Sequence, residues 1–189
     1  MRIQLTTITI SLFLIFNTFH SQAQLVNREK NEGKGDKVKW YSFEDAYVAN
    51  KKKPKKIFVD VFTDWCGWCK KMDAETFTNP VISAYMMKHF YCVKLNAERK
   101  DTVIIDGQTF TNPHPSSTRS THQIANELLK GNMSYPSYVF LNEKGQWLTV
   151  VPGYQNAHDF EAVLHYFAED FYNKTPWEEY KSSFVGEIK

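Results

Sequence analysis

The feature that most constrains this chain is a pair of cysteines three positions apart, Cys66 and Cys69, within residues 65–70. An apolar, β-rich run at residues 57–62 precedes the pair, and a helical pattern begins at Lys70. The pair is therefore expected at a junction between a strand and a helix. A Cys-x-x-Cys pair serves metal binding, haem attachment or redox chemistry, so the rest of the sequence must separate these three.

The expected position at a helix start favours redox chemistry. Cys66 would precede the first helical turn and Cys69 would lie within it, so their sulfurs could form a disulfide with little backbone movement. Cys66 would also face the free N–H groups and the positive end of the helix dipole, which favour a thiolate. Lys70 and Lys71 add positive charge nearby. We expect Cys66 to be the attacking nucleophile and Cys69 to stay protonated until it resolves the mixed disulfide.

The competing chemistries lack partners in the sequence. A zinc site needs a second ligand pair, and Cys92 with an unplaced histidine is a poor candidate. Covalent haem attachment needs a histidine directly after the second cysteine, where this chain has Lys70. We therefore expect no metal and no cofactor. Cys92 lies in a buried-strand pattern and is expected to be inert. No ligand spacing, and so no role, is seen for His89, His114, His122, His158 and His165.

Composition indicates one globular domain without nucleic-acid binding. The 23 basic residues nearly balance the 21 acidic ones, whereas nucleic-acid binding proteins usually carry a clustered basic face. The lysines between positions 51 and 56 do cluster, and a solvated turn before a buried strand is the preferred interpretation. Apolar residues make up 42% of the 189 positions, which is enough for a substantial core.

The first residues have the pattern of a signal peptide, expected at 1–23. Arg2 supplies positive charge, residues 8–19 are largely apolar, and residues 21–23 put small side chains at a cleavage site. The alternative is an uncleaved anchor, but the apolar stretch is short against the roughly 20 residues of a spanning helix. A flexible leader is expected at residues 24–37. The mature protein is expected to be soluble and exported, either periplasmic or secreted.

Helical and strand patterns alternate along the remaining chain, which predicts an α/β fold with a mixed sheet. Helices are expected at residues 43–52, 70–76, 81–89, 121–130 and 157–172, with a short one after Thr175. Strands are expected at residues 57–62, 90–95, 103–105, 108–110, 137–141 and 146–151.

Four landmarks resemble the thioredoxin-fold disulfide oxidoreductases. Residues 59–70 are similar to that family's strand and active-site turn, residues 93–96 to its next central strand, residues 135–137 to its cis-proline loop, and Gly153 to the glycine after its last strand. Residues 73–81 resemble the exported thioredoxin-like branch that includes the C-terminal domain of the membrane reductant conductor DsbD.

This resemblance implies a thioredoxin fold, with a central mixed sheet flanked by helices. An insertion would precede the cis-proline strand, within residues 97–135, and would either bind substrates or partners or be decoration. The thioredoxin-like domain would span residues 38–172. A helical extension at residues 173–189 would pack on that domain.

The resemblance also implies roles for two charged residues. Asp60 matches a buried acid behind the cysteines, where desolvation would raise its pKa and let it exchange a proton with Cys69. The alternative is an acid satisfied by a local hydrogen bond. Lys94 matches a lysine that pairs with Asp60, although an ordinary surface lysine is equally consistent with the sequence.

The expected substrate-binding residues surround the cysteine pair. Pro136 is expected to follow a cis peptide bond, with Tyr135 offering its backbone to an extended substrate by β-type pairing. An ordinary trans turn is the alternative. Trp65, Gly67 and Trp68 would complete this surface. Trp68 is expected to be exposed, whereas part of Trp65 is expected to pack.

The predicted function is that of an exported thiol–disulfide oxidoreductase, which reduces or exchanges disulfides in client proteins through a Cys66–Cys69 disulfide couple. A reductase in an oxidising compartment needs an electron donor, such as a membrane reductant conductor. The alternatives are a peptide-binding or chaperone module with a permanent disulfide, and a thiol peroxidase.

Overall fold

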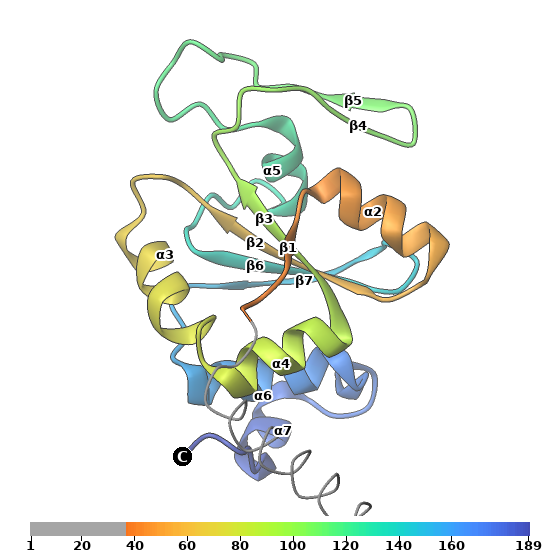
Figure 1. Ribbon diagram of the computed structural model, residues 1–189, viewed down its shortest axis with the longest axis vertical. Helices are drawn as coiled ribbons and strands as arrows, with labels where there is room; N and C mark the ends of the chain where they lie inside the picture. The colour runs from red at the N-terminus through yellow and green to blue at the C-terminus, as the bar shows by residue number, and fades with distance from the viewer. Residues whose placement is uncertain (1–36) are drawn as a thin grey trace, which may run out of the picture. The chain divides into compact units, whose positions relative to one another are not determined.

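The computed structural model describes residues 37–189, and Figure 1 shows the elements they form. The predicted signal peptide and all but the last residue of the predicted leader lie outside the described residues. The elements are β1 (Trp40–Tyr41), α2 (Phe43–Lys52), β2 (Lys56–Phe62), α3 (Gly67–Lys71), a π-helical segment (Met72–Thr76), α4 (Pro80–His89), β3 (Phe90–Asn96), β4 (Val103–Ile105), β5 (Gln108–Phe110), α5 (Gln123–Leu128), β6 (Ser137–Leu141), β7 (Trp147–Pro152), α6 (Ala157–Ala168), a 3-10 turn (Phe171–Asn173) and α7 (Trp177–Ser183).

A five-stranded mixed sheet lies at the centre of the fold, in the order β1-β3-β2-β6-β7. Strands β1, β3 and β2 are parallel, and β6 and β7 run antiparallel to their neighbours. Strand β2 is the middle strand and its first six residues are buried, as its apolar sequence predicted. The predicted mixed α/β fold is confirmed.

Helices cover both faces of this sheet and bury two separate apolar cores. Because side chains alternate along a strand, Phe58 points into one core while Ile57 and Val59 point into the other. The first core includes residues of α4 and α6, and the second includes residues of α2 and α5. Strand β2 is thus held from both sides, and its C-terminal end carries the cysteine pair.

The insertion forms a small sheet of its own. Strands β4 and β5 pair only with each other in the described part of the chain. Both strands were predicted; Asp106-Gly107 forms the turn between them, and both of its residues have positive φ values, 49° and 78°, which suit a tight hairpin turn. The insertion therefore adds no strand to the central sheet.

Three expectations about local structure were wrong. The α-helix after the cysteines ends at Lys71, and the residues that follow it, Met72–Thr76, form the π-helical segment. The predicted helix 157–172 ends at Ala168, because Asp170 takes a left-handed conformation with φ of 61°. The lysine cluster is not wholly solvated, since Lys56 begins β2 and is buried. Its ammonium group pairs with Asp170 at 2.9 Å. This long-range contact cannot be predicted from helical periodicity.

The C-terminal residues lie against the first core. Trp177, Phe184 and Ile188 pack on it. The carboxylate of Glu161 on α6 is 2% exposed and accepts the backbone N–H groups of Glu187 and Ile188 at 2.7 and 3.0 Å. A buried carboxylate thus ties down the end of the chain. None of the helices in residues 37–189 combines the length and apolar character needed to cross a membrane.

Candidate active site

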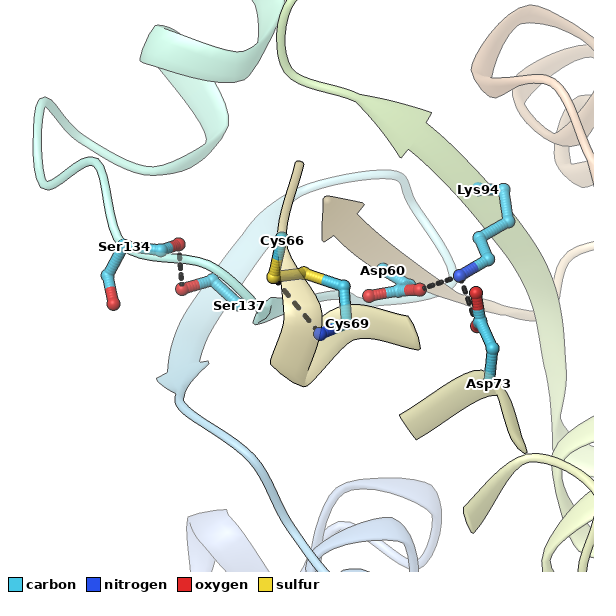
Figure 2. Close-up of a disulfide and its surroundings, with 7 residues drawn as sticks. All are labelled: Asp60, Cys66, Cys69, Asp73, Lys94, Ser134 and Ser137. Atoms are coloured by element: carbon cyan, nitrogen blue, oxygen red, sulfur yellow. Dashed lines mark hydrogen bonds and ion pairs between the residues drawn. A yellow bond between two sulfur atoms is a disulfide. The ribbon is translucent and has the colours of Figure 1, made fainter. Parts of the chain in front are cut away.

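Cys66 and Cys69 form a disulfide at the N-terminus of α3, where β2 has ended four residues earlier (Figure 2). Their Cα atoms are 5.3 Å apart. Cys66 is the N-cap residue of α3, and its Sγ accepts the backbone N–H of Cys69 at 3.0 Å. Both cysteines are largely buried, with 5% and 2% of their surface exposed. The structure therefore describes the oxidised form of the pair, with the Cys66 sulfur at the positive end of the helix.

Asp60 lies behind the disulfide, on the central strand. Parallel pairing of β2 with β3 places it opposite Lys94, whose Nζ donates to Asp60 Oδ2 at 2.5 Å. The same Nζ also bonds Asp73, on the π-helical segment. Lys94 is therefore part of a charge network that extends from the buried Asp60 to the exposed Asp73, and the alternative of a free surface lysine is excluded.

Burial decides the protonation of Asp60. The carboxyl group is 1% exposed, and this desolvation raises the pKa of Asp60 to about 6, although the charge and hydrogen bond of Lys94 act to lower it. Such an acid changes protonation close to neutral pH, which is what proton exchange with a thiol requires.

One oxygen of Asp60 is left available. Figure 2 shows the carboxylate between the disulfide and Lys94, with one oxygen toward the ammonium group and the other on the side of the cysteines. The second oxygen, Oδ1, makes no hydrogen bond within residues 37–189, and neither do the buried hydroxyls of Thr63 and Tyr138. Buried polar atoms are nearly always paired, so three unpaired polar groups at this end of the sheet are an unusual feature of the site.

The loop before β6 forms a second wall of the site. The Tyr135–Pro136 peptide bond is cis. The carbonyl of Pro136 accepts the N–H of Gly153 at 2.8 Å, and the hydroxyl of Ser137 donates to the carbonyl of Ser134 at 2.8 Å (Figure 2). Within the described residues, the backbone N–H and C=O of Tyr135 make no hydrogen bond. They are available to pair with an extended peptide.

Two tryptophans flank the cysteine pair on the outside. Trp65 is 51% exposed and Trp68 is 57% exposed. The rings of Trp65 and Tyr135 pack in a T-shaped arrangement, with centroids 5.9 Å apart. The rings of Trp68 and Tyr154 also pack together, with centroids 5.2 Å apart. Gly67 between them is also exposed. Trp65 thus packs on the cis-proline loop and not in the core, and both tryptophans keep about half of their surface exposed.

The sequence analysis missed two residues of this network. Asp73 follows Cys69 by four positions, one helical turn, and this spacing could have placed it near the site. Tyr138 stands opposite Asp60 across the β2–β6 pair, a register that single-strand patterns do not contain. Its neighbour Asp60 and above all its burial raise the pKa of Tyr138 well above the usual value, so the phenol keeps its proton.

Cys92 does not belong to the site. It is 1% exposed on β3, and burial raises the pKa of its thiol to about 12. A thiol that stays protonated is a poor nucleophile. Residues 37–189 also contain no group of three or more His, Cys, Asp or Glu side chains arranged to hold a metal ion.

Comparisons with known proteins agree with this geometry. Residues 43–168, more than half of the chain, match the family model of the thioredoxin-like domain. The chain therefore belongs to the thioredoxin-like domain family. Among curated relatives, mouse spermatogenesis-associated protein 20 is 34% identical over 67 residues, which make up 35% of this chain and 8% of that protein.

Solved structures show the same fold at low sequence identity. The DsbH oxidoreductase superposes with a TM-score of 0.51 and 17% identity, covering 73% of this chain and 89% of that one. A putative disulphide-isomerase from Bacteroides thetaiotaomicron gives a TM-score of 0.51 and 23% identity, covering 72% of this chain and 95% of that one. These similarities support the fold alone.

Proposed function

We propose that this protein is an exported thiol–disulfide oxidoreductase that reduces or exchanges disulfides in client proteins. The observation that carries the proposal is the Cys66–Cys69 disulfide at a helix N-terminus, backed by Asp60, a buried acid with one available oxygen. A permanently closed structural disulfide would need no acid of this kind. Export is supported by the signal-peptide pattern of residues 1–23.

The reaction runs through a mixed disulfide. In the reduced protein, the thiolate of Cys66 attacks one sulfur of a client disulfide; that S–S bond breaks, and the other client sulfur leaves as a thiolate. The Asp60 carboxylate then accepts the proton of Cys69, whose sulfur attacks Cys66 and expels the second client sulfur. Two electrons pass from the cysteine pair to the client. Regeneration requires a dithiol donor, for which a membrane reductant conductor is the proposed class.

The client would be held along the cis-proline loop. The available backbone of Tyr135 would pair with an extended client segment, and the exposed parts of Trp65 and Trp68 would contact side chains on either side of the attacked sulfur. Backbone pairing would align the client disulfide with Cys66 whatever the side chains of the client, which suits clients that differ in sequence.

The decisive experiment replaces Cys69 with Ser. The variant cannot resolve the mixed disulfide, so reduced protein should accumulate covalent client adducts that migrate as larger species on non-reducing gels. The matched control, Cys92→Ser, should release its clients normally. If no adduct forms, and the wild type neither reduces insulin nor exchanges with glutathione, the oxidoreductase function fails and a peptide-binding module is favoured. Peroxide consumption by the reduced wild type would instead support a thiol peroxidase.

A further inference from the structure

One side of the candidate active site is built partly by the insertion. The indole Nε1–H of Trp65 donates to the carboxylate of Glu98 at 3.0 Å. The guanidinium carbon of Arg119 lies 5.0 Å from the centre of the Trp65 ring. Glu98 and Arg119 come from the stretch between β3 and α5, 33 and 54 positions further along the chain than Trp65. The insertion therefore fixes the tryptophan next to the attacking cysteine.

Arg119 itself has two unusual properties. Its backbone has a φ of 61°, which is uncommon for a residue other than glycine and often marks a functional position. Its side chain makes no salt bridge within residues 37–189, and the residue is exposed. A guanidinium group that lies over an aromatic ring directs its N–H donors within its own plane, where they can bind a carboxylate with two hydrogen bonds.

The loop that carries Arg119 is firmly held. The side-chain amide of Asn112 donates to the carbonyls of Arg99 and Ser120 at 3.0 and 2.8 Å, and the Ser120 hydroxyl donates back to Asn112 at 2.6 Å. Ser120 is the direct neighbour of Arg119. A ligand that binds Arg119 thus finds the loop already ordered, which reduces the entropy cost of binding.

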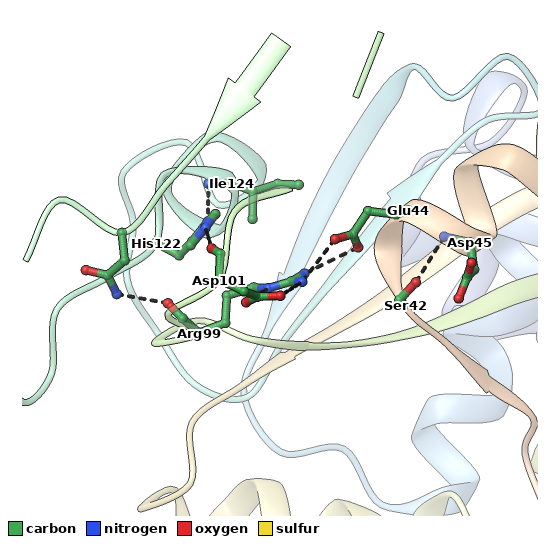
Figure 3. Close-up of polar contacts among 8 residues, drawn as sticks. Ser42, Glu44, Asp45, Arg99, Asp101, His122 and Ile124 are labelled. Carbon is green, nitrogen blue, oxygen red and sulfur yellow. Dashed lines mark hydrogen bonds and ion pairs between the residues drawn. The ribbon is translucent and has the colours of Figure 1, made fainter. Parts of the chain in front are cut away.

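Contacts of Arg99 and His122 secure the base of the insertion, as Figure 3 shows. Arg99 forms salt bridges with Glu44 on α2 at 3.0 Å and with Asp101 at 2.6 Å. The ring of His122 is fully buried; its Nδ1 accepts the N–H of Ile124 at 3.1 Å and its Nε2 lies 2.9 Å from the carbonyl of Asp101. Burial lowers the pKa of His122, so the ring stays neutral and holds both contacts.

The cation that lies over the second tryptophan is already paired with a carboxylate. Lys71 lies over the rings of Trp68 and Tyr154, at 5.4 and 4.9 Å from their centres, but it already pairs with Glu75 at 3.8 Å. The two tryptophans therefore differ: Trp65 carries an unpaired cation and Trp68 carries a neutralised one. Of these two cations, only Arg119 remains to attract a negatively charged ligand.

We propose that Arg119, stacked on Trp65, is a carboxylate-binding residue that selects clients with an acidic side chain near the disulfide. Glu98 acts as a positioning residue, because it orients the indole on which Arg119 rests. Since Trp65 adjoins Cys66, a carboxylate bound by Arg119 lies within a few residues of the attacked sulfur in an extended client. This inference rests on the proposed function and adds the chemistry by which clients are chosen.

The test uses synthetic peptides, each closed by one disulfide and identical except at one position. That position, moved stepwise to either side of one cysteine, carries Glu, Gln or Lys. The value of kcat/KM for reduction by the wild type should be about threefold higher for the best Glu peptide than for its Gln partner, in the range of an exposed ion pair. This preference should shrink at about 0.5 M salt, where screening is strong.

Variants at Arg119 separate charge recognition from other effects. Arg119→Gln should lose the preference for Glu, and Arg119→Glu should prefer the Lys peptide. The control Lys144→Gln, on an exposed turn away from the site, should keep the wild-type ratio. The inference is overturned if no Glu peptide is preferred at any position, or if Arg119→Gln keeps the preference. Reduction of the neutral hydroxyethyl disulfide by the wild type tests the proposed function separately; its absence would mean that the proposed function itself has failed.

Discussion

Two buried charges on the same strand behave in opposite ways. Lys56 and Asp60 lie four positions apart on β2, with 4% and 1% of their surface exposed. The Lys56 ammonium group has three acceptors, Glu143 at 2.6 Å, Asp170 at 2.9 Å and the carbonyl of Ala168 at 3.4 Å, and so uses all its donors. Within residues 37–189, Asp60 pairs only with Lys94 and keeps one oxygen unpaired.

Their pKa values follow from this difference. Burial acts to lower the pKa of Lys56, but the hydrogen bonds to Glu143 and Asp170 outweigh it and raise that pKa, so the lysine stays charged. For Asp60, burial outweighs its single partner and the pKa rises to about 6. A fully paired charge holds elements together, whereas a partly paired one can change its protonation. The same strand thus carries a fully paired charge at Lys56 and a partly paired charge at Asp60.

The largest effect is expected from removing the partners of Lys56. Glu143→Ala combined with Asp170→Asn leaves a buried ammonium group without a carboxylate, and should lower the free energy of unfolding by about 3–4 kcal/mol. Urea denaturation at pH 7 measures this loss. Adding Lys56→Met should restore most of the stability, since no buried charge remains. A loss below about 1 kcal/mol would show that the pairing of Lys56 is not what stabilises this end of the strand.

The second prediction concerns the pH dependence that Asp60 imposes. Its folded-state pKa of about 6 exceeds the ordinary value of 3.8, so the folded protein holds the proton more tightly, and stability falls as pH rises from about 4 through 6. Asp60→Asn lacks this fall. Its stability relative to wild type should therefore improve by about 2–3 kcal/mol between pH 4 and pH 8, as measured by urea denaturation at both values. Parallel curves for the two proteins would contradict the raised pKa.

Replacing Lys94 should raise the pKa of Asp60 further. Lys94→Met removes the cation that lowers the pKa of Asp60, so the pH midpoint of the resolving step should rise by about one unit. Stopped-flow measurement of mixed-disulfide decay across pH gives this midpoint. Lys88→Met, on the exposed side of α4, is the matched control. A profile that does not move would mean that Lys94 does not influence the reactive acid.

The smallest effect is expected at an exposed ion pair. Lys51 and Asp106 pair at the hairpin of the insertion, and both side chains are more than half exposed. Asp106→Asn keeps a residue that tolerates the local positive φ and should leave the melting temperature at nearly its wild-type value, because exposed ion pairs contribute little. Thermal unfolding checks this value. A clearly larger loss of stability would show that burial is not what separates strong ion pairs from weak ones.

Local signals were enough to predict much of the fold. The strand before the cysteines, the two short strands at residues 103–105 and 108–110, and the helix at residues 43–52 were all expected, and the structure contains them. Each depends on residues within a few positions of one another. Resemblance to a known family added the thioredoxin fold and the residues expected at the site. The roles of those residues are predictions.

What the sequence did not reveal depends on long-range contacts. The early end of α6 follows from the pairing of Asp170 with Lys56, residues 114 positions apart. The approach of Tyr138 to Asp60 follows from strand register. His122 could not be assigned a role, because its use as an N-cap depends on where α5 begins and on the carbonyl of Asp101. Periodicity within one segment contains none of this information.

The separate two-stranded sheet of the insertion has a practical consequence. Within the described residues β4 and β5 pair with each other and not with the central sheet, so a change between Asn112 and Ser120 alters no strand pairing, including the register that aligns Asp60 with Lys94. Grafting a different loop there would replace Arg119 and the surface next to Trp65. Under the proposed function, such a graft would alter which client proteins are recognised and leave the Cys66–Cys69 pair in place.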